Sequence, residues 1–167
     1  MSKNLLRLIR YGLCGKYVFH GSPKLIDGLL LPNKTSRGSD GVVMYEGTSL
    51  HATPLLYVAL NYLTIATQTC ASGVCLFHAT NTIDILCMDS KQTTSAALQM
   101  LFARGGYVYV LASERFSTTK GLGMLEVISR KAVQPVHRVR LSKNDAITLL
   151  RMLGTRIQML PQDAGKV

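Results

Sequence analysis

The sequence predicts an α+β fold in a single domain spanning residues 1–167. The length of 167 residues suits one domain with a substantial core. Hydrophobic residues make up 47% and charged residues 17%, a composition typical of a globular rather than a disordered chain. Segments of β type outnumber helical ones and do not alternate regularly with them, which favours α+β over a doubly wound sheet.

The elements follow from local patterns. Arg7 and Arg10 interrupt the leucine-rich N-terminus, which predicts a short amphipathic helix and no signal peptide. Pro54 suits the first turn of a helix over residues 54–67, with Leu55, Val58, Ala59 and Tyr62 on one face. Two further helices are predicted at 94–103 and 146–153, the last opened by a capping box from Ser142 to Asp145 and ended by Gly154. The predicted strands are residues 16–20, 42–45, 49–52, 74–78, 82–86, 107–111, 125–129 and 136–141. Residues 29–41, rich in Gly, Ser, Pro, Asn and Lys, are predicted to form a long exposed loop.

Four cysteines are too few for a disulfide scaffold in a chain of this length. They are Cys14, Cys70, Cys75 and Cys87. Cys70 and Cys75 flank a short turn and can approach each other, but no further Cys or His stands at ligand spacing, so no zinc site is expected. Reduced thiols in the cytoplasm are the simplest interpretation, with no membrane span and no targeting signal. Delivery into another cell stays open.

The net charge of +10 is the strongest compositional signal. It indicates attraction to nucleic acid, an anionic surface or a nucleotide, or a charge that only keeps the protein soluble. No Walker-type or dinucleotide-binding glycine loop is present, and Gly121-Leu-Gly123 alone is weak. The nine acidic residues form no pair of the kind that metal nucleases or glycosidases use.

The histidines are the remaining candidates for chemistry. His51, His78 and His137 lie in β-type segments and are interpreted as structural. His20 ends a strand in the stretch Y-V-F-H-G-S-P. Gly21 permits close approach of a ligand or a backbone, and Ser22 can return a hydrogen bond to the turn. Taken alone, this stretch favours geometry over chemistry.

Several motifs in a fixed order give the stretch more weight. F-H-G-S-P is followed by a Gly/Ser-rich loop, S-L-H-A-T-P, a helix with V-A-L-N-Y, and finally M-L-E-V. This order resembles the ADP-ribosyltransferase fold, in its diphtheria-toxin and poly(ADP-ribose) polymerase branch with a His-Tyr-Glu signature, over residues 17–141. The resemblance implies mixed β-sheets with flanking helices, NAD as substrate, and transfer of ADP-ribose to a protein or nucleic-acid acceptor. Small transferases of this kind are often toxins or effectors.

The resemblance also implies roles for individual residues. Glu126 would stabilise the positive charge that develops on the ribose as nicotinamide leaves. His20 would hydrogen-bond a ribose hydroxyl, Gly21 would pair with the carboxamide, and Tyr62 would stack on the nicotinamide ring. The other implied NAD contacts are Ser22, Ser49 and Leu50, with Lys24 or Arg37 at the pyrophosphate.

The chain departs from the family pattern in two places. Leu50 stands where the polymerase branch has a tyrosine, or His51 does if the alignment shifts by one, unless Tyr45 or Tyr57 substitutes. Met124 replaces the Glu or Gln of the arginine-modifying branch, which disfavours an arginine acceptor. Two alternatives remain: a non-catalytic module on the same fold that binds nucleic acid or a partner, and an NAD glycohydrolase.

Overall fold

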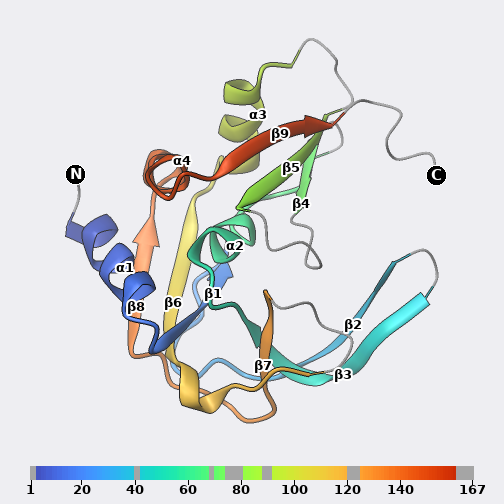
Figure 1. Ribbon diagram of the computed structural model, residues 1–167, viewed down its shortest axis with the longest axis vertical. Helices are drawn as coiled ribbons and strands as arrows, with labels where there is room; N and C mark the ends of the chain where they lie inside the picture. The colour runs from blue at the N-terminus through green and yellow to red at the C-terminus, as the bar shows by residue number, and fades with distance from the viewer. Residues whose placement is uncertain are drawn as a thin grey trace.

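The computed structural model describes residues 3–39, 42–67, 70–73, 81–87, 92–119 and 125–160, and the chain is α+β (Figure 1). Its helices are α1 (Lys3–Leu13), α2 (Leu56–Asn61), α3 (Thr94–Leu101) and α4 (Lys143–Met152). Its strands are β1 (Tyr17–Ser22), β2 (Asn33–Ser39), β3 (Val42–Ala52), β4 (Cys70–Gly73), β5 (Thr82–Cys87), β6 (Gly106–Ala112), β7 (Val127–Ser129), β8 (His137–Leu141) and β9 (Arg156–Leu160). They form three small sheets, ordered β1-β6-β8, β2-β3-β7 and β4-β5-β9.

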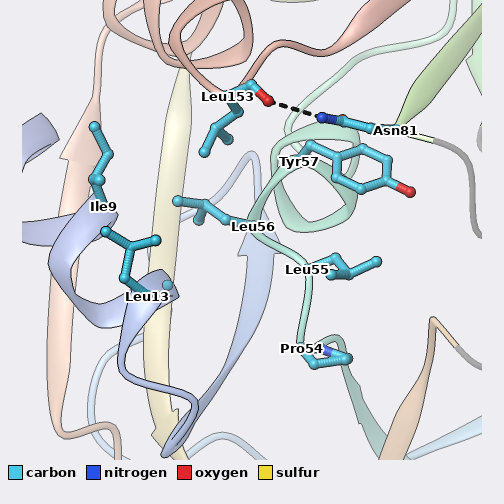
Figure 2. A pocket seen from close by; sticks show the side chains of 9 residues that line it. Ile9, Leu13, Pro54, Leu55, Leu56, Tyr57, Asn81 and Leu153 are labelled. Atoms are coloured by element: carbon cyan, nitrogen blue, oxygen red, sulfur yellow. Dashed lines mark hydrogen bonds between the residues drawn. The ribbon is translucent and has the colours of Figure 1, made fainter.

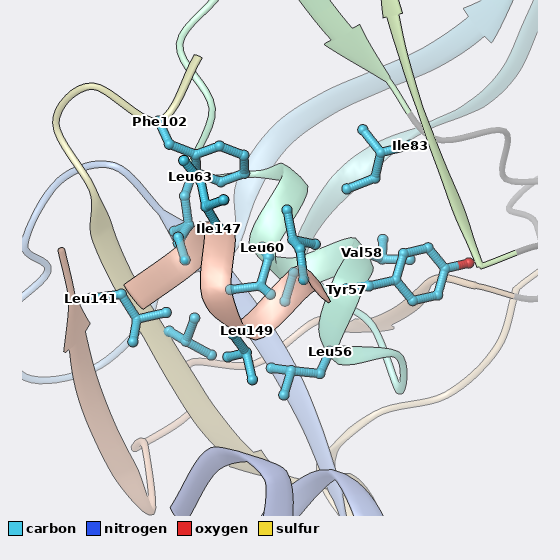
Figure 3. Close-up of a cluster of buried hydrophobic side chains, with 14 of the residues drawn as sticks. Leu56, Tyr57, Val58, Leu60, Leu63, Ile83, Phe102, Leu141, Ile147 and Leu149 are labelled. Atoms are coloured by element: carbon cyan, nitrogen blue, oxygen red, sulfur yellow. The ribbon is translucent and has the colours of Figure 1, made fainter. Parts of the chain in front are cut away.

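The β1-β6-β8 sheet is antiparallel, and each of its faces covers a different hydrophobic cluster. Because side chains alternate along a strand, Phe19, Val108 and Val139 share one face, where α1, α2 and α4 pack. Figure 3 shows this cluster, which includes Leu60, Leu63, Phe102, Leu141 and Ile147. His20 and Tyr109 lie on the opposite face, with Val18, Leu111 and the smaller cluster around Leu30.

The prediction of a long loop over residues 29–41 is wrong for residues 33–39, which form strand β2. β2 pairs with β3 in a long hairpin that extends away from the first sheet, and β3 is one continuous strand where two were predicted (Figure 1). The polar composition follows from exposure: Asn33, Lys34 and Ser36 are all exposed, so nothing requires apolar residues there. A strand without a buried face gives no alternating pattern to detect.

The predicted helix over 54–67 is shorter in the structure. α2 begins at Leu56 and ends at Asn61, whose carbonyl accepts the Thr64 hydroxyl at 2.7 Å, and Ile65 N–H then bonds to the carbonyl of Leu101. All five residues from Leu56 to Leu60 are buried, because the helix packs into the core on several sides. A helix buried all round lacks the single apolar face that the prediction assumed.

The capping box is confirmed: the Ser142 hydroxyl accepts Asp145 N–H, and the Asp145 carboxylate accepts Ser142 N–H. The sequence did not predict β4 or β9, although β9 completes its sheet as a parallel partner of β5. The predicted strand over 74–78, with His78 and Cys75, lies outside the described residues.

The expectation of reduced thiols is wrong for Cys70, which is disulfide-bonded. β4 pairs with β5, and the backbone register sets Cys70 opposite Cys87. Cys14 is free and exposed. Among the described residues, no helix has the length and apolarity needed to cross a bilayer, and no group of three or more His, Cys, Asp or Glu stands ready for a metal ion.

Candidate active site

A line of polar side chains occupies one face of β3. Residues 45, 47, 49 and 51 share this face because side chains alternate along a strand. The Tyr45 hydroxyl lies 2.8 Å from Ser49 Oγ, and Ser49 Oγ lies 2.9 Å from His51 Nε2. Gly47 makes the first contact possible, because a Cβ at this position would come within 2.8 Å of the Tyr45 hydroxyl. The Tyr45 ring therefore folds back over a glycine to reach Ser49.

Glu126 joins this line through the pairing of β3 with β7. His51 lies opposite Ile128 in the register, so the residue two positions before Ile128 is a diagonal neighbour on the same face. His51 Nδ1 approaches Glu126 Oε1 to 2.6 Å, with the imidazole N–H donating to the carboxylate. The Glu126 side chain is only 2% exposed and that of His51 11%. A short hydrogen bond at this depth holds both groups in one orientation.

His20 enters the same cluster from β1. Its Nδ1–H donates to the carbonyl oxygen of His51 at 2.8 Å, which fixes the tautomer and leaves Nε2 as an acceptor in the neutral ring. Burial lowers the pKa of His20, the His51 backbone hydrogen bond opposes this shift, and the nearby His51 ring adds to it. His20 is therefore neutral near pH 7 and presents an acceptor nitrogen. No described residue hydrogen-bonds that nitrogen.

Gly21 shapes the edge of the site. A Cβ at this position would lie 1.9 Å from the carbonyl oxygen of Ala59 and 3.1 Å from Tyr62 Cβ, so only glycine allows the end of α2 to pack against β1. Phe19 exchanges backbone hydrogen bonds with Thr53 on the outer edge of β1. Gly21 is two residues beyond Phe19, so its N–H and C=O point to the same edge of β1. Neither group makes a backbone hydrogen bond to another described element. Gly21 thus offers a donor and an acceptor beside Tyr62, which is 36% exposed.

The remaining predicted site residues are distributed around this centre. The Ser22 hydroxyl donates to the Lys24 carbonyl and accepts Lys24 N–H, which confirms the predicted hydrogen bond to the turn. Lys24 itself is exposed. Ser49 is in the β3 line, whereas the side chain of Leu50 points to the opposite face and packs in the smaller hydrophobic cluster. The Arg37 side chain lies outside what the structure describes.

Sequence reasoning missed two members of the centre. His51 was interpreted as a structural histidine, but it is the residue that links His20 to Glu126. Tyr45 was considered only as a substitute for a missing aromatic, and it extends the line through Ser49. The signal that was available is the period-two spacing of Y-x-G-x-S-x-H in one strand. The other candidate aromatic, Tyr57, is 6% exposed and belongs to the large core.

An apolar cavity lies elsewhere in the described chain. It has a volume of about 330 Å³ and is lined mainly by Ile9, Leu13, Leu55, Leu56 and Leu153, between α1 and α2 (Figure 2). Asn81 Nδ2 closes one side by donating to the carbonyl oxygen of Leu153 at 2.8 Å. This cavity is lined by none of the polar residues around His51, so it is not the site described above.

The arrangement can support acid–base chemistry and charge stabilisation. The buried Glu126 carboxylate, bonded to the His51 imidazole, can stabilise a positive charge nearby. The imidazole in turn contacts the Ser49 hydroxyl, which contacts the Tyr45 hydroxyl, so these groups can relay a proton. Glu126, His51 and Ser49 have the connectivity of an acid–histidine–nucleophile triad, and the side chains of Ser49 and Glu126 are both almost fully buried, 1% and 2% exposed. No family model, curated protein or solved structure matched this chain.

Proposed function

We propose that this protein is an NAD-dependent ADP-ribosyltransferase that adopts the fold of that family. One observation carries the proposal: His20, His51 and Glu126, from three distant parts of the sequence, form one hydrogen-bonded series. His20 and Glu126 are the two residues that the family resemblance selects as the ribose contact and the catalytic carboxylate. Of the two residues that can stand at the tyrosine position of the family's strand, Leu50 packs in the smaller hydrophobic cluster and His51 bonds to Glu126.

The reaction assigns a task to each group. As the bond between ribose C1′ and nicotinamide breaks, its electron pair leaves with nicotinamide and positive charge develops on the ribose. The buried Glu126 carboxylate stabilises this charge at low local dielectric, and the His51 imidazole holds the carboxylate in place. The acceptor then donates an electron pair to C1′, and its proton passes to the Glu126–His51 pair.

The rim of the site suits the nicotinamide end of NAD. The outward N–H and C=O of Gly21 match the acceptor and donor of a carboxamide. Tyr62, beside Gly21 and partly exposed, would supply an aromatic face for the ring, worth about 0.5–1.5 kcal/mol beyond burial. The neutral His20 would accept a hydrogen bond from a ribose hydroxyl through Nε2.

The proposal is tested by incubating the protein with NAD labelled in both halves, together with cell extract. We expect nicotinamide release with transfer of labelled ADP-ribose to a macromolecule, and a loss of about 100-fold or more for Glu126→Gln, as for other single groups that stabilise transition-state charge. Release without transfer would instead identify an NAD glycohydrolase. The proposal is wrong if neither product forms or if Glu126→Gln equals the wild type.

A further inference from the structure

Two rows of side chains cross the β1-β6-β8 sheet on the face that carries His20. Strand register sets His20 opposite Tyr109 and Tyr109 opposite Arg138 in the first row. In the second row Ser22 lies opposite Tyr107, and Tyr107 lies opposite Arg140. Arg140 lies two strands and one row from His20. Because neighbouring strands are about 4.8 Å apart and alternate residues of a strand about 7 Å apart, this is about 10 Å across the sheet and about 7 Å along it.

The first row is closed by the segment that follows β1. Tyr109 is fully buried, and its hydroxyl accepts Ile26 N–H at 2.6 Å. Arg138 donates to Asp27 Oδ1 at 2.7 Å. Each polar group beyond His20 in this row therefore already has a partner in the protein.

The second row is open. Tyr107 is half-buried, with its ring 6.5 Å from that of Tyr109, so the inner row supports one side of it. Arg140 is exposed and makes no ion pair or side-chain hydrogen bond with any described residue. An aromatic ring next to an arginine of this kind matches the two parts of a nucleotide, because bases stack on aromatic rings and guanidinium groups bind phosphate in a bidentate manner.

We infer that Tyr107 and Arg140 form the subsite for the adenylate half of NAD, an inference that rests on the proposed function. With the nicotinamide ribose at His20, the other half of the dinucleotide extends over Ser22 along the open row. Arg140 binds an oxygen of the adenylate phosphate, which nicotinamide mononucleotide lacks, and Tyr107 stacks on the adenine ring. Ser22, whose hydroxyl is engaged in its own turn, forms the passage between the two halves.

Calorimetric titration with NAD and with nicotinamide mononucleotide, which lacks the adenylate, tests the subsite. Arg140→Gln should weaken NAD binding about 10- to 100-fold, the range for hydrogen bonds to charged groups, and leave the mononucleotide unchanged. Tyr107→Leu keeps the buried apolar contact, removes the aromatic face, and should weaken NAD binding about 5-fold or more. Arg151→Gln, an exposed arginine on α4, is the matched control and should bind both ligands as the wild type does.

The outcomes separate the two proposals. If wild-type protein binds NAD and both the Arg140 and Tyr107 variants bind it equally well, the subsite is wrong and the proposed function stands. An equal loss for NAD and the mononucleotide also overturns the subsite, because the residues would then act on the shared half. If the wild type binds neither ligand, the proposed function itself fails.

Discussion

Replacing Gly21 by alanine tests the packing that forms the site edge. The added Cβ would lie 1.9 Å from the Ala59 carbonyl oxygen, more than 1 Å inside the 3.0 Å that real Cβ contacts require. The obstacle is backbone rather than a flexible side chain, so α2 or β1 must move. Overpacking of this kind costs about 1–3 kcal/mol. In a chain of this size, that lowers Tm by about 2–12 °C.

The sign of the effect makes the test sharp, because Gly→Ala normally stabilises a strand or helix by about 0.5–1 kcal/mol. Gly12→Ala on α1 is the control: its nearest neighbour would be a leucine methyl at 3.9 Å, and it should be neutral or stabilising. Urea unfolding and calorimetry measure the stability of both variants. Titration with NAD measures whether displacement of Tyr62 by the added methyl group weakens NAD binding. A Gly21→Ala protein as stable as the wild type would refute the close approach of α2 to β1.

Three further predictions follow from individual contacts. His51→Phe removes the donor to the buried Glu126 carboxylate and should lower the free energy of unfolding, measured by urea titration, by about 1–3 kcal/mol. The control His137→Phe, at a more exposed contact, should change it by less than about 0.5 kcal/mol. Equal losses for the two variants would contradict the role of His51. Ser142→Ala breaks the capping box and should cost about 0.5–2 kcal/mol by the same assay, and an unchanged midpoint would show that the cap contributes nothing. Because burial lowers the pKa of His20 below 6.5, the unfolded chain takes up a proton before the native one does, so stability is complete above pH 6.5 and falls as pH decreases towards the folded pKa. The slope is at most about 1.4 kcal/mol per pH unit for this proton, and His20→Gln should reduce it; an unchanged slope would refute the assignment.

The sequence predicted those elements whose own residues carry a clear local pattern. β1 and β6 have apolar runs bounded by glycine, and α4 has both a capping box and Gly154 at its end. β2 escaped because its described side chains are largely exposed and give no alternation of apolar and polar residues. β9 does alternate, but only over the four residues from Arg156 to Met159, a short and partly exposed signal.

The site was accessible to sequence reasoning only at its ends. His20 and Glu126 were selected by motif, but the link between them depends on the β3–β7 register, which joins residues 75 positions apart in the chain. A histidine in a strand looks structural until its cross-strand neighbour is known. The contribution of Tyr45 likewise depends on Gly47, whose role is visible only from the path of the tyrosine ring.

A crystal structure of the Glu126→Gln protein soaked with NAD tests the central claim most directly. The account predicts the carboxamide at the outer edge of Gly21, the nicotinamide ring beside Tyr62, and the attached ribose between His20 and the position of Glu126. NAD bound elsewhere, such as in the apolar cavity between α1 and α2, would contradict it. So would the absence of NAD from crystals soaked well above the dissociation constant measured in solution.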